Sequence, residues 1–194
     1  ASDTSPNIGF QVVALGDINL DGFADFVAAS APPLQSLIFL GGAPADSTPA
    51  FVLRGSVNET AILDMDGDGI ADVVTSVPSS PGLLMYKGTG TGFLTYPSDS
   101  LLDNSGVNFG SWFRVGLVDT GRIGDVLVSD HDYPPGGRIG LYLNPFLAGD
   151  TSIWSWNNTD VQRQILGGGL IDFNGDGQID IFIAVQGAEG FVFI

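Results

Sequence analysis

Short apolar runs separated by polar turn residues dominate the chain. The runs are mostly four to six residues long and rich in Val, Ile, Leu and Phe. Turn residues bound each run, which is typical of β-strands, and no window of a dozen residues has the period of an amphipathic helix. The pattern therefore predicts an all-β fold. The clearest runs are Gln11–Leu15, Phe26–Ala29, Leu37–Leu40, Val73–Ser76, Leu83–Tyr86, Val126–Ser129, Ile181–Val185 and Phe191–Ile194.

An acidic motif recurs along the chain and divides it into repeats. Three full copies span Asp17–Asp25, Asp64–Asp72 and Asp172–Asp180, and a shorter copy spans Asp119–Asp125. Starts at 17, 64, 119 and 172 give spacings of 47, 55 and 53 residues. Each interval has room for about four short strands, the content of one β-propeller blade. We therefore expect one domain over 1–194, built from repeats at about 8–55, 56–105, 106–160 and 161–194.

The full motif, Asp-x-Asp/Asn-x-Asp-Gly-x-x-Asp, suits a calcium ion. Calcium takes about six to eight oxygen ligands. We expect positions 1, 3 and 5 to converge, the glycine at position 6 to allow a sharp turn, and position 7 to offer its backbone carbonyl. The aspartate at position 9 would complete the shell. The sequence thus predicts about three Ca²⁺ sites, with these ligands: Asp17, Asn19, Asp21, Phe23 and Asp25; Asp64, Asp66, Asp68, Ile70 and Asp72; Asp172, Asn174, Asp176, Gln178 and Asp180.

Two other interpretations of these loops are weaker. An EF-hand requires Glu at position 12 between two helices, whereas position 12 is Ala28, Thr75 or Ile183 here. Metal-free Asp-Gly turns are common singly, but three carboxyl-rich copies would each carry like-charge repulsion without a cation. The middle loop, which has four aspartates, is the strongest candidate.

The repeats resemble the FG-GAP repeats of integrin α-subunit propellers and their bacterial and fungal relatives. Phe109-Gly110 precedes the short motif, and Ile8-Gly9 holds the matching place before the first. Ser30-Ala31-Pro32 and Ser76-Val77-Pro78 lie where that family has Gly-Ala-Pro. The resemblance implies a β-propeller of four-stranded blades whose acidic loops join strands 1 and 2 and hold calcium. Integrin-like propellers have seven blades, so four repeats imply either a small ring or part of a larger propeller.

The resemblance also implies where partners bind. In integrin-like propellers the partner face lies opposite the calcium loops. A protein or glycan ligand would then meet the loops near Ala31–Gln35, Ser79–Pro81, Asp130–Gly137 and Gln186–Glu189.

Composition narrows the function classes. Among 194 residues, 22 acids against 6 bases give a formal charge of −16, which disfavours a nucleic-acid partner. The chain has no cysteine, so neither disulfides nor thiolate metal sites are possible. Its longest uncharged stretch, Phe26–Ala45, is interrupted by several Pro and Gly residues, so no membrane span is expected.

The shorter motif lacks the middle carboxylates and contains Arg122 instead. One hypothesis is that its guanidinium pairs with Asp119 or Asp125 and partly replaces the missing cation. The alternative is that Arg122 points to water.

Few residues outside the loops suggest chemistry. His131, the single histidine, is expected in an exposed loop. Trp154 and Trp156 lie on one side of a predicted strand, either as a sugar or protein platform or packed against a neighbouring blade. Twelve of the 22 acids lie in the acidic motifs, and no nucleophile or base cluster stands out among the rest, so we do not expect an enzyme.

The expected function is that of a calcium-stabilised β-propeller that acts as a non-catalytic recognition, adhesion or assembly module. Because millimolar calcium is an extracellular condition, we expect a secreted or cell-surface protein. Two alternatives stay open: a carbohydrate-binding lectin propeller, and a self-assembling surface or filament subunit whose open sheet edge accepts another copy.

Overall fold

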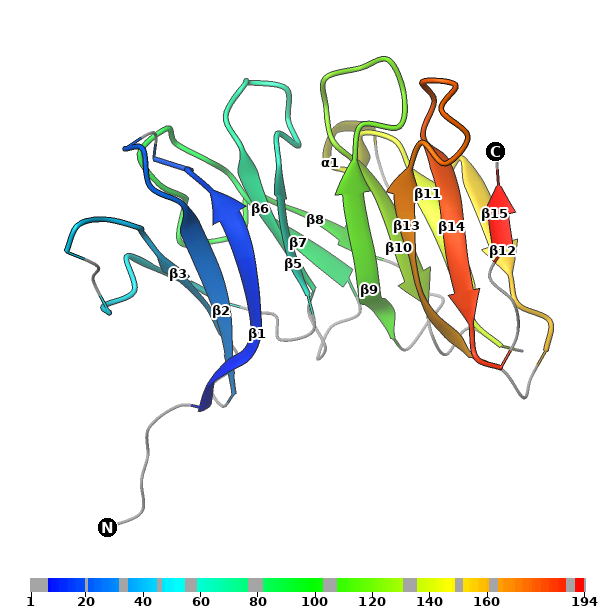
Figure 1. The fold of residues 1–194 in the computed structure, drawn as a ribbon, viewed down its shortest axis with the longest axis horizontal. Helices are drawn as coiled ribbons and strands as arrows, with labels where there is room; N and C mark the ends of the chain where they lie inside the picture. The colour runs from blue at the N-terminus through cyan, green and yellow to red at the C-terminus, as the bar shows by residue number, and fades with distance from the viewer. Residues whose placement is uncertain are drawn as a thin grey trace, which may run out of the picture.

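The chain folds into four antiparallel β-sheets, each made of consecutive strands (Figure 1). The structure is a computed structural model that describes residues 7–19, 21–31, 35–44, 47–54, 59–76, 82–102, 108–130, 136–148, 152–160, 164–187 and 191–193. The all-β prediction is confirmed. One four-residue helix, α1 (Pro145–Ala148), was not predicted, because a single turn is too short to show a helical period.

The strands of each sheet follow chain order. The first sheet holds β1 (Asn7–Gly16), β2 (Asp25–Ala31), β3 (Gln35–Phe39) and β4 (Phe51–Arg54). The second holds β5 (Thr60–Leu63), β6 (Asp72–Ser76), β7 (Gly82–Tyr86) and β8 (Asp99–Leu102). The third holds β9 (Phe109–Gly116), β10 (Asp125–Asp130), β11 (Arg138–Tyr142) and β12 (Trp154–Asn157). The fourth holds β13 (Ile165–Ile171), β14 (Asp180–Val185) and β15 (Phe191–Phe193).

The four sheets stand side by side in an open row. The first strand of each sheet contacts the first strand of the next: β1 meets β5, β5 meets β9, and β9 meets β13. In Figure 1 the first and last sheets lie at opposite ends of the row. The turns β1–β2, β5–β6, β9–β10 and β13–β14 all lie along its upper edge. Consecutive repeats therefore present their acidic motifs on one edge of the molecule.

Three hydrophobic clusters fill the spaces between neighbouring sheets. All residues of the second strands β6 and β10 are buried, because these sheets are covered on both faces. This explains why the sequence shows continuous apolar runs there rather than strict alternation. Each cluster contains large side chains from both of the sheets that it joins, such as Leu53 with Tyr86, Leu83 with Phe113, and Leu127 with Ile183.

The Phe109-Gly110 pair begins β9 at the boundary between the second and third sheets. Phe109 is 3% exposed and belongs to the cluster between these sheets. Gly110 has a φ of +83°, and a Cβ there would lie 3.0 Å from the Gly82 carbonyl oxygen of β7. Glycine allows both this backbone conformation and this close approach.

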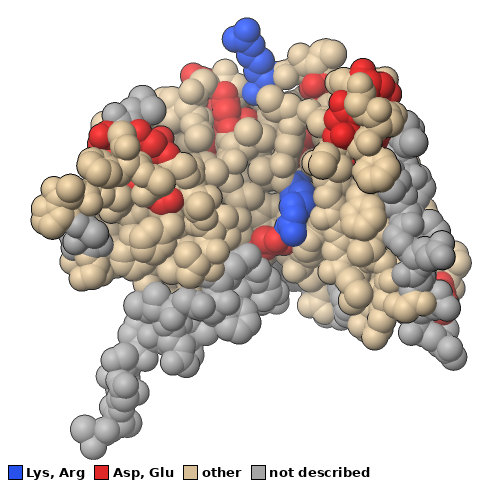
Figure 2. All heavy atoms as spheres, in the orientation of Figure 1, with Lys and Arg blue, Asp and Glu red and all other residues tan. Residues whose placement is uncertain are grey.

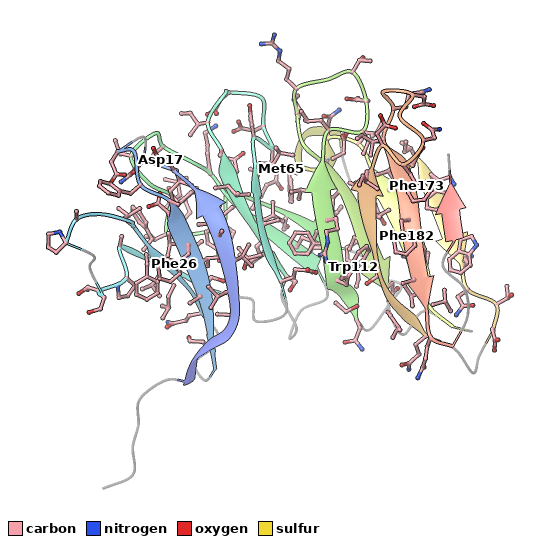
Figure 3. All side chains as sticks on the ribbon, in the orientation of Figure 1. Asp17, Phe26, Met65, Trp112, Phe173 and Phe182 are labelled. Carbon is pink, nitrogen blue, oxygen red and sulfur yellow. The ribbon has the colours of Figure 1, made fainter. Side chains whose placement is uncertain are left out.

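The two ends of the row carry exposed apolar side chains. On the outer face of the first sheet, Val12 is 61% exposed, and Phe26 stacks on Phe39 with ring centroids 4.9 Å apart. On the last sheet, Leu166 is 63% exposed, and Phe182 points away from the cluster that contains Ile181 and Ile183 (Figure 3). These outer faces, as described, have no covering sheet.

Candidate metal sites

The predicted ligands lie in three turns on the same edge of the row. Acidic atoms gather along the upper edge of the face shown in Figure 2, and Figure 3 labels Asp17 and Phe173 at that edge. Each turn winds around the aspartate at position 1, which accepts a hydrogen bond from the glycine N–H at position 6. The N···O distances are 2.8 Å from Gly22 to Asp17, 2.8 Å from Gly69 to Asp64, and 2.9 Å from Gly177 to Asp172.

The glycine at position 6 has the conformation that the motif predicts. The φ angles are +91° at Gly22, +85° at Gly69 and +85° at Gly177. Side chains with a Cβ rarely adopt this left-handed region. The turn therefore brings positions 1, 3 and 5 together because glycine permits the reversal.

Positions 3 and 5 are linked by side chain to backbone hydrogen bonds. In the first loop, Asn19 Oδ1 accepts from the N–H of Asp21 at 3.2 Å, and Asp21 Oδ1 accepts from the N–H of Phe23 at 2.9 Å. The same second bond joins Ile70 to Asp68 and Gln178 to Asp176, each at 2.8 Å. The N–H of position 7 thus donates to the carboxylate of position 5. That the carbonyl groups of Phe23, Ile70 and Gln178 bind a metal stays a prediction.

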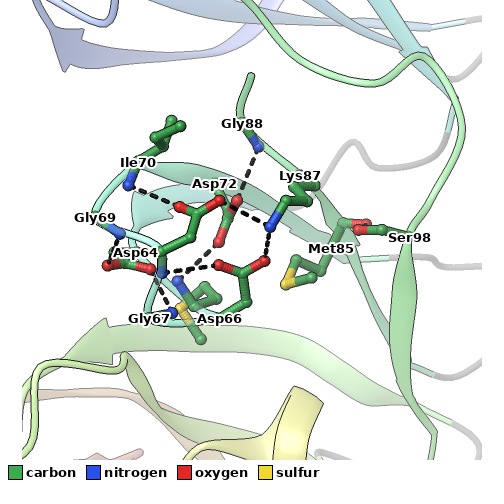
Figure 4. Close-up of polar contacts among 12 residues, drawn as sticks. Asp64, Asp66, Gly67, Gly69, Ile70, Asp72, Met85, Lys87, Gly88 and Ser98 are labelled. Carbon is green, nitrogen blue, oxygen red and sulfur yellow. Dashed lines mark hydrogen bonds and ion pairs between the residues drawn. The ribbon is translucent and has the colours of Figure 1, made fainter. Parts of the chain in front are cut away.

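The middle loop brings its carboxylates closest together. Asp64, Asp66 and Asp72 each offer an oxygen atom, and these three atoms lie within 4.8 Å of one another. The ammonium group of Lys87 pairs with Asp66 and lies 2.8 Å from Asp68 Oδ2 (Figure 4). These hydrogen bonds raise the pKa of Lys87, and the hydrogen bond from Lys87 lowers the pKa of Asp68. The sequence did not associate Lys87 with the loop, because it lies after β7.

The aspartate at position 9 is buried in every copy, including the shortened one. The exposed fractions are 1% for Asp25, 0% for Asp72, 0% for Asp125 and 2% for Asp180. Each accepts the backbone N–H of the residue seven positions earlier, at 2.7–2.8 Å: Ile18, Met65, Val118 and Phe173 respectively. Position 9 therefore has a structural role.

A second bond from the same carboxylate reaches past the third strand. Asp25 accepts the N–H of Gly41 at 2.6 Å, Asp72 that of Gly88 at 2.8 Å, and Asp125 that of Asn144 at 3.1 Å. Burial raises the pKa of Asp72 and Asp125, while these N–H donors act in the opposite direction. The shortened motif lacks the acids of positions 3 and 5 but keeps this aspartate, which is the sequence signal for its structural role.

The donor set fits a hard divalent cation. Every side-chain ligand offered at positions 1, 3, 5 and 9 is a carboxylate or amide oxygen. Calcium and magnesium prefer such oxygens, and calcium accepts a larger number of protein ligands in flexible geometry. If calcium binds, positions 1, 3 and 5 would hold it, together with Asp72 at position 9 in the middle loop, and its role would be to neutralise the clustered carboxylates.

In the shortened loop, Asp119–Asp125, the hypothesis that an arginine replaces the cation is wrong. Arg122 is exposed, and it pairs with neither Asp119 nor Asp125 in the part of the chain that the structure describes. The Gly121 N–H donates to Asp119 at 2.6 Å. The loop is stabilised from outside instead, because the N–H of Gly124 donates to the Asp64 carbonyl of the middle loop at 2.7 Å.

Trp154 and Trp156 lie on one side of β12, as period two predicts. Both are partly buried against the cluster between the third and fourth sheets, while Ser155 and Asn157 are exposed. The tryptophans therefore serve packing between sheets rather than forming a free platform. His131 and most of the loop residues expected to meet a partner lie outside the described residues.

One polar cluster was missed by sequence reasoning. Glu59 precedes β5, accepts the Phe113 N–H at 2.9 Å, and pairs with the Arg114 guanidinium. Arg114 also lies over the Trp112 ring, 5.0 Å from its centroid. A hollow of about 330 Å³ between β1, β5 and β9 is lined in part by Glu59 and Arg114. No sequence signal links these residues, because they come from different repeats.

Comparisons with known proteins bring no relative. No protein-family model matches the chain, and no curated protein matches its sequence. Among the residues that the structure describes, no helix is long and apolar enough to span a membrane.

Proposed function

We propose that this chain is a calcium-stabilised β-propeller module, or part of one, with a non-catalytic role in recognition or adhesion outside the cell. The observation that carries the proposal is the repetition of one turn. Three loops of the same construction, in the first, second and fourth sheets, gather side-chain oxygens on one edge of the row. A metal-free Asp-Gly turn does not require several oxygen-bearing side chains at fixed spacing, whereas an ion bound in each turn does.

The order of strands supports a radial arrangement. Each sheet runs in chain order from a strand that contacts the neighbouring first strands, as the blades of a propeller do. The open row favours part of a larger propeller over a small closed ring, because the first and last sheets lie apart. The FG-GAP resemblance leads to the same proposal.

Calcium would act by stabilising the folded state. The unfolded chain does not hold positions 1, 3 and 5 together, so an ion binds the folded turns preferentially. Such binding stabilises a protein by about 4 kcal/mol when the ion is in thousandfold excess over its dissociation constant. Because extracellular calcium is millimolar, weak sites of this type would be filled in a secreted or cell-surface protein. A protein or glycan ligand would then meet the edge opposite the acidic turns.

Thermal unfolding with 5 mM calcium and with excess chelator tests this proposal. We expect calcium to raise the Tm, and the double substitution Asp21→Asn with Asp176→Asn to reduce the increase. Asp119→Asn, in the loop without the full ligand set, is the matched control and should leave the calcium-induced increase in Tm unchanged. The same Tm in calcium and in chelator would overturn the proposal.

A second candidate, a self-assembling subunit, has one observation in its favour. Val12 and Leu166 are about three-fifths exposed on the two opposite end faces of the row. Each end face belongs to the same type of sheet that packs face to face three times within the chain. The outer face of the last sheet in one copy could therefore pack on the outer face of the first sheet in the next. No specific observation favours the lectin alternative, because Trp154 and Trp156 pack between sheets.

A further inference from the structure

The middle loop differs from the first and last loops in how position 3 is satisfied. Asn19 Nδ2 donates to Asp21 Oδ2 at 3.0 Å, and Asn174 Nδ2 donates to Asp176 Oδ2 at 3.1 Å. In the middle loop position 3 is Asp66, which has no amide to donate. There the Lys87 ammonium donates to Asp66 and to Asp68 Oδ2 (Figure 4). The loop with an additional carboxylate is therefore the loop that has a lysine.

The position of Lys87 has counterparts in two other sheets. Lys87 directly precedes Gly88, whose N–H donates to Asp72. The residues that directly precede the equivalent donors, Gly41 and Asn144, are Leu40 and Leu143. A cation thus occupies this place only beside the four-aspartate loop, among the three sheets in which the place can be compared.

We propose that Lys87 is a built-in counter-ion that competes with calcium for Asp66 and Asp68, so that the middle loop binds calcium more weakly than the first and last loops. The inference rests on the proposed function, because it concerns the same turns. It reverses the ranking that the sequence suggests, in which four aspartates make the middle loop strongest.

The competition follows from charge. A calcium ion that uses Asp66 and Asp68 must break the lysine contacts or tolerate a positive charge close to itself. The lysine ammonium and a calcium ion about 4 Å apart would repel each other with about twice the energy of two unit charges at that distance. This repulsion is present even when the surroundings have the dielectric constant of water. We therefore expect at least a tenfold difference in dissociation constant between Lys87 and a neutral side chain at this position.

A calcium titration followed by amide NMR resolves the three loops. The N–H groups of Gly22, Gly69 and Gly177 each donate to the position 1 aspartate of their own loop, so their chemical shifts report on one loop each. In the unmodified chain, Gly69 should respond at a higher calcium concentration than Gly22 and Gly177. In Lys87→Met, the Gly69 midpoint should fall at least tenfold while the other two stay unchanged.

Two control variants separate the charge from packing. Lys87→Arg keeps the charge, and we expect it to leave the Gly69 midpoint within about threefold of its original value. Leu40→Met changes the equivalent neutral position in the first sheet, and it should leave all three midpoints unchanged. Lys87→Gln replaces Lys87→Met if the spectrum of that variant is not that of a folded protein.

The outcomes distinguish this inference from the proposed function. If Gly22 and Gly177 respond to calcium but the Gly69 midpoint is the same with Lys87 and with a neutral residue, the inference about Lys87 is overturned and the proposed function stands. If no amide responds in either protein, the proposed function fails and the inference fails with it.

Discussion

The backbone N–H of Gly88 donates to the carboxylate of Asp72 at 2.8 Å, which joins the acidic turn of the second sheet to the loop that follows its third strand. The other oxygen of Asp72 accepts the Met65 N–H at 2.8 Å. One buried carboxylate therefore satisfies two backbone donors that are far apart in sequence. This relationship separates two roles of the acidic motif: position 9 organises the fold, while positions 1, 3 and 5 gather at the surface.

The shortened loop allows the structural role to be tested alone. We expect Asp125→Asn to lower the free energy of unfolding by about 1–3 kcal/mol, because asparagine cannot accept from both Val118 and Asn144 and leaves a buried donor unsatisfied. The loss should be equal in calcium and in chelator, as measured by urea unfolding. Asp119→Asn is the control and should change stability by less than about 0.5 kcal/mol. A loss that disappears in chelator would contradict a purely structural role.

The close approach at Gly88 predicts a strong steric effect. A Cβ at this position would lie 2.2 Å from the Ala71 carbonyl oxygen and 2.7 Å from Ile70 Cγ2. Gly88→Ala should therefore cost about 1–3 kcal/mol through overpacking. Gly169→Ala is the matched control, since a Cβ there meets no atom within 4 Å. Equal unfolding midpoints for the two variants would show that the loop moves freely to accommodate the methyl group.

The lysine contact predicts a pH window. The pKa of Asp68 is lowered in the folded chain. Its contribution to the free energy of unfolding is therefore complete above the pKa of the unfolded chain, near 4, and is lost as the pH falls through the pKa of the folded chain. The pKa of Lys87 is raised in the folded chain. Its contribution to the free energy of unfolding is therefore complete below the pKa of the unfolded chain, near 10.4, and is lost as the pH rises through the pKa of the folded chain. In calcium-free buffer, Lys87→Met should thus be less stable than the original chain between about pH 4 and 10.

Urea unfolding of both proteins at several pH values measures this difference. We expect the gap in unfolding free energy to narrow below about pH 4, where Asp68 takes up its proton. A gap that stays constant from pH 7 to pH 3 would mean that Lys87 stabilises the loop through its alkyl chain and not through its charge.

The exposed end faces predict concentration-dependent association. If copies pack end to end, replacing Val12 with Thr and Leu166 with Gln should reduce the mean mass measured by light scattering at high protein concentration. Both side chains are mostly exposed, so the double variant should keep the original Tm within a few degrees. A wild-type chain that is monomeric at every concentration, with or without calcium, would rule out the second candidate.

Strand positions could be predicted because they depend on local pattern. The runs Val73–Ser76 and Leu83–Tyr86 lie within β6 and β7, and the repeat limits enclose each sheet except for Asn7. The position 6 glycines were recognised for a local reason as well, since a reversal at Gly69 requires a positive φ. Helix α1 gave no such signal, because it is a single turn. The hydrogen bond from the Asn144 N–H to Asp125 gave none either, because it involves a single residue outside the motif.

The class of fold, the repeats and the cluster of side-chain oxygens in each of the three turns can be read from the sequence alone, because strand periodicity, turn chemistry and motif spacing are properties of neighbouring residues. The groups that contact those oxygens from other segments follow from the tertiary structure. Lys87 meets Asp66, Gly88 meets Asp72 and Gly124 meets the Asp64 carbonyl because sheet pairing and the packing of adjacent sheets bring separate segments together. Such contacts depend on where folded strands end in space, and spacing along the chain does not encode that directly.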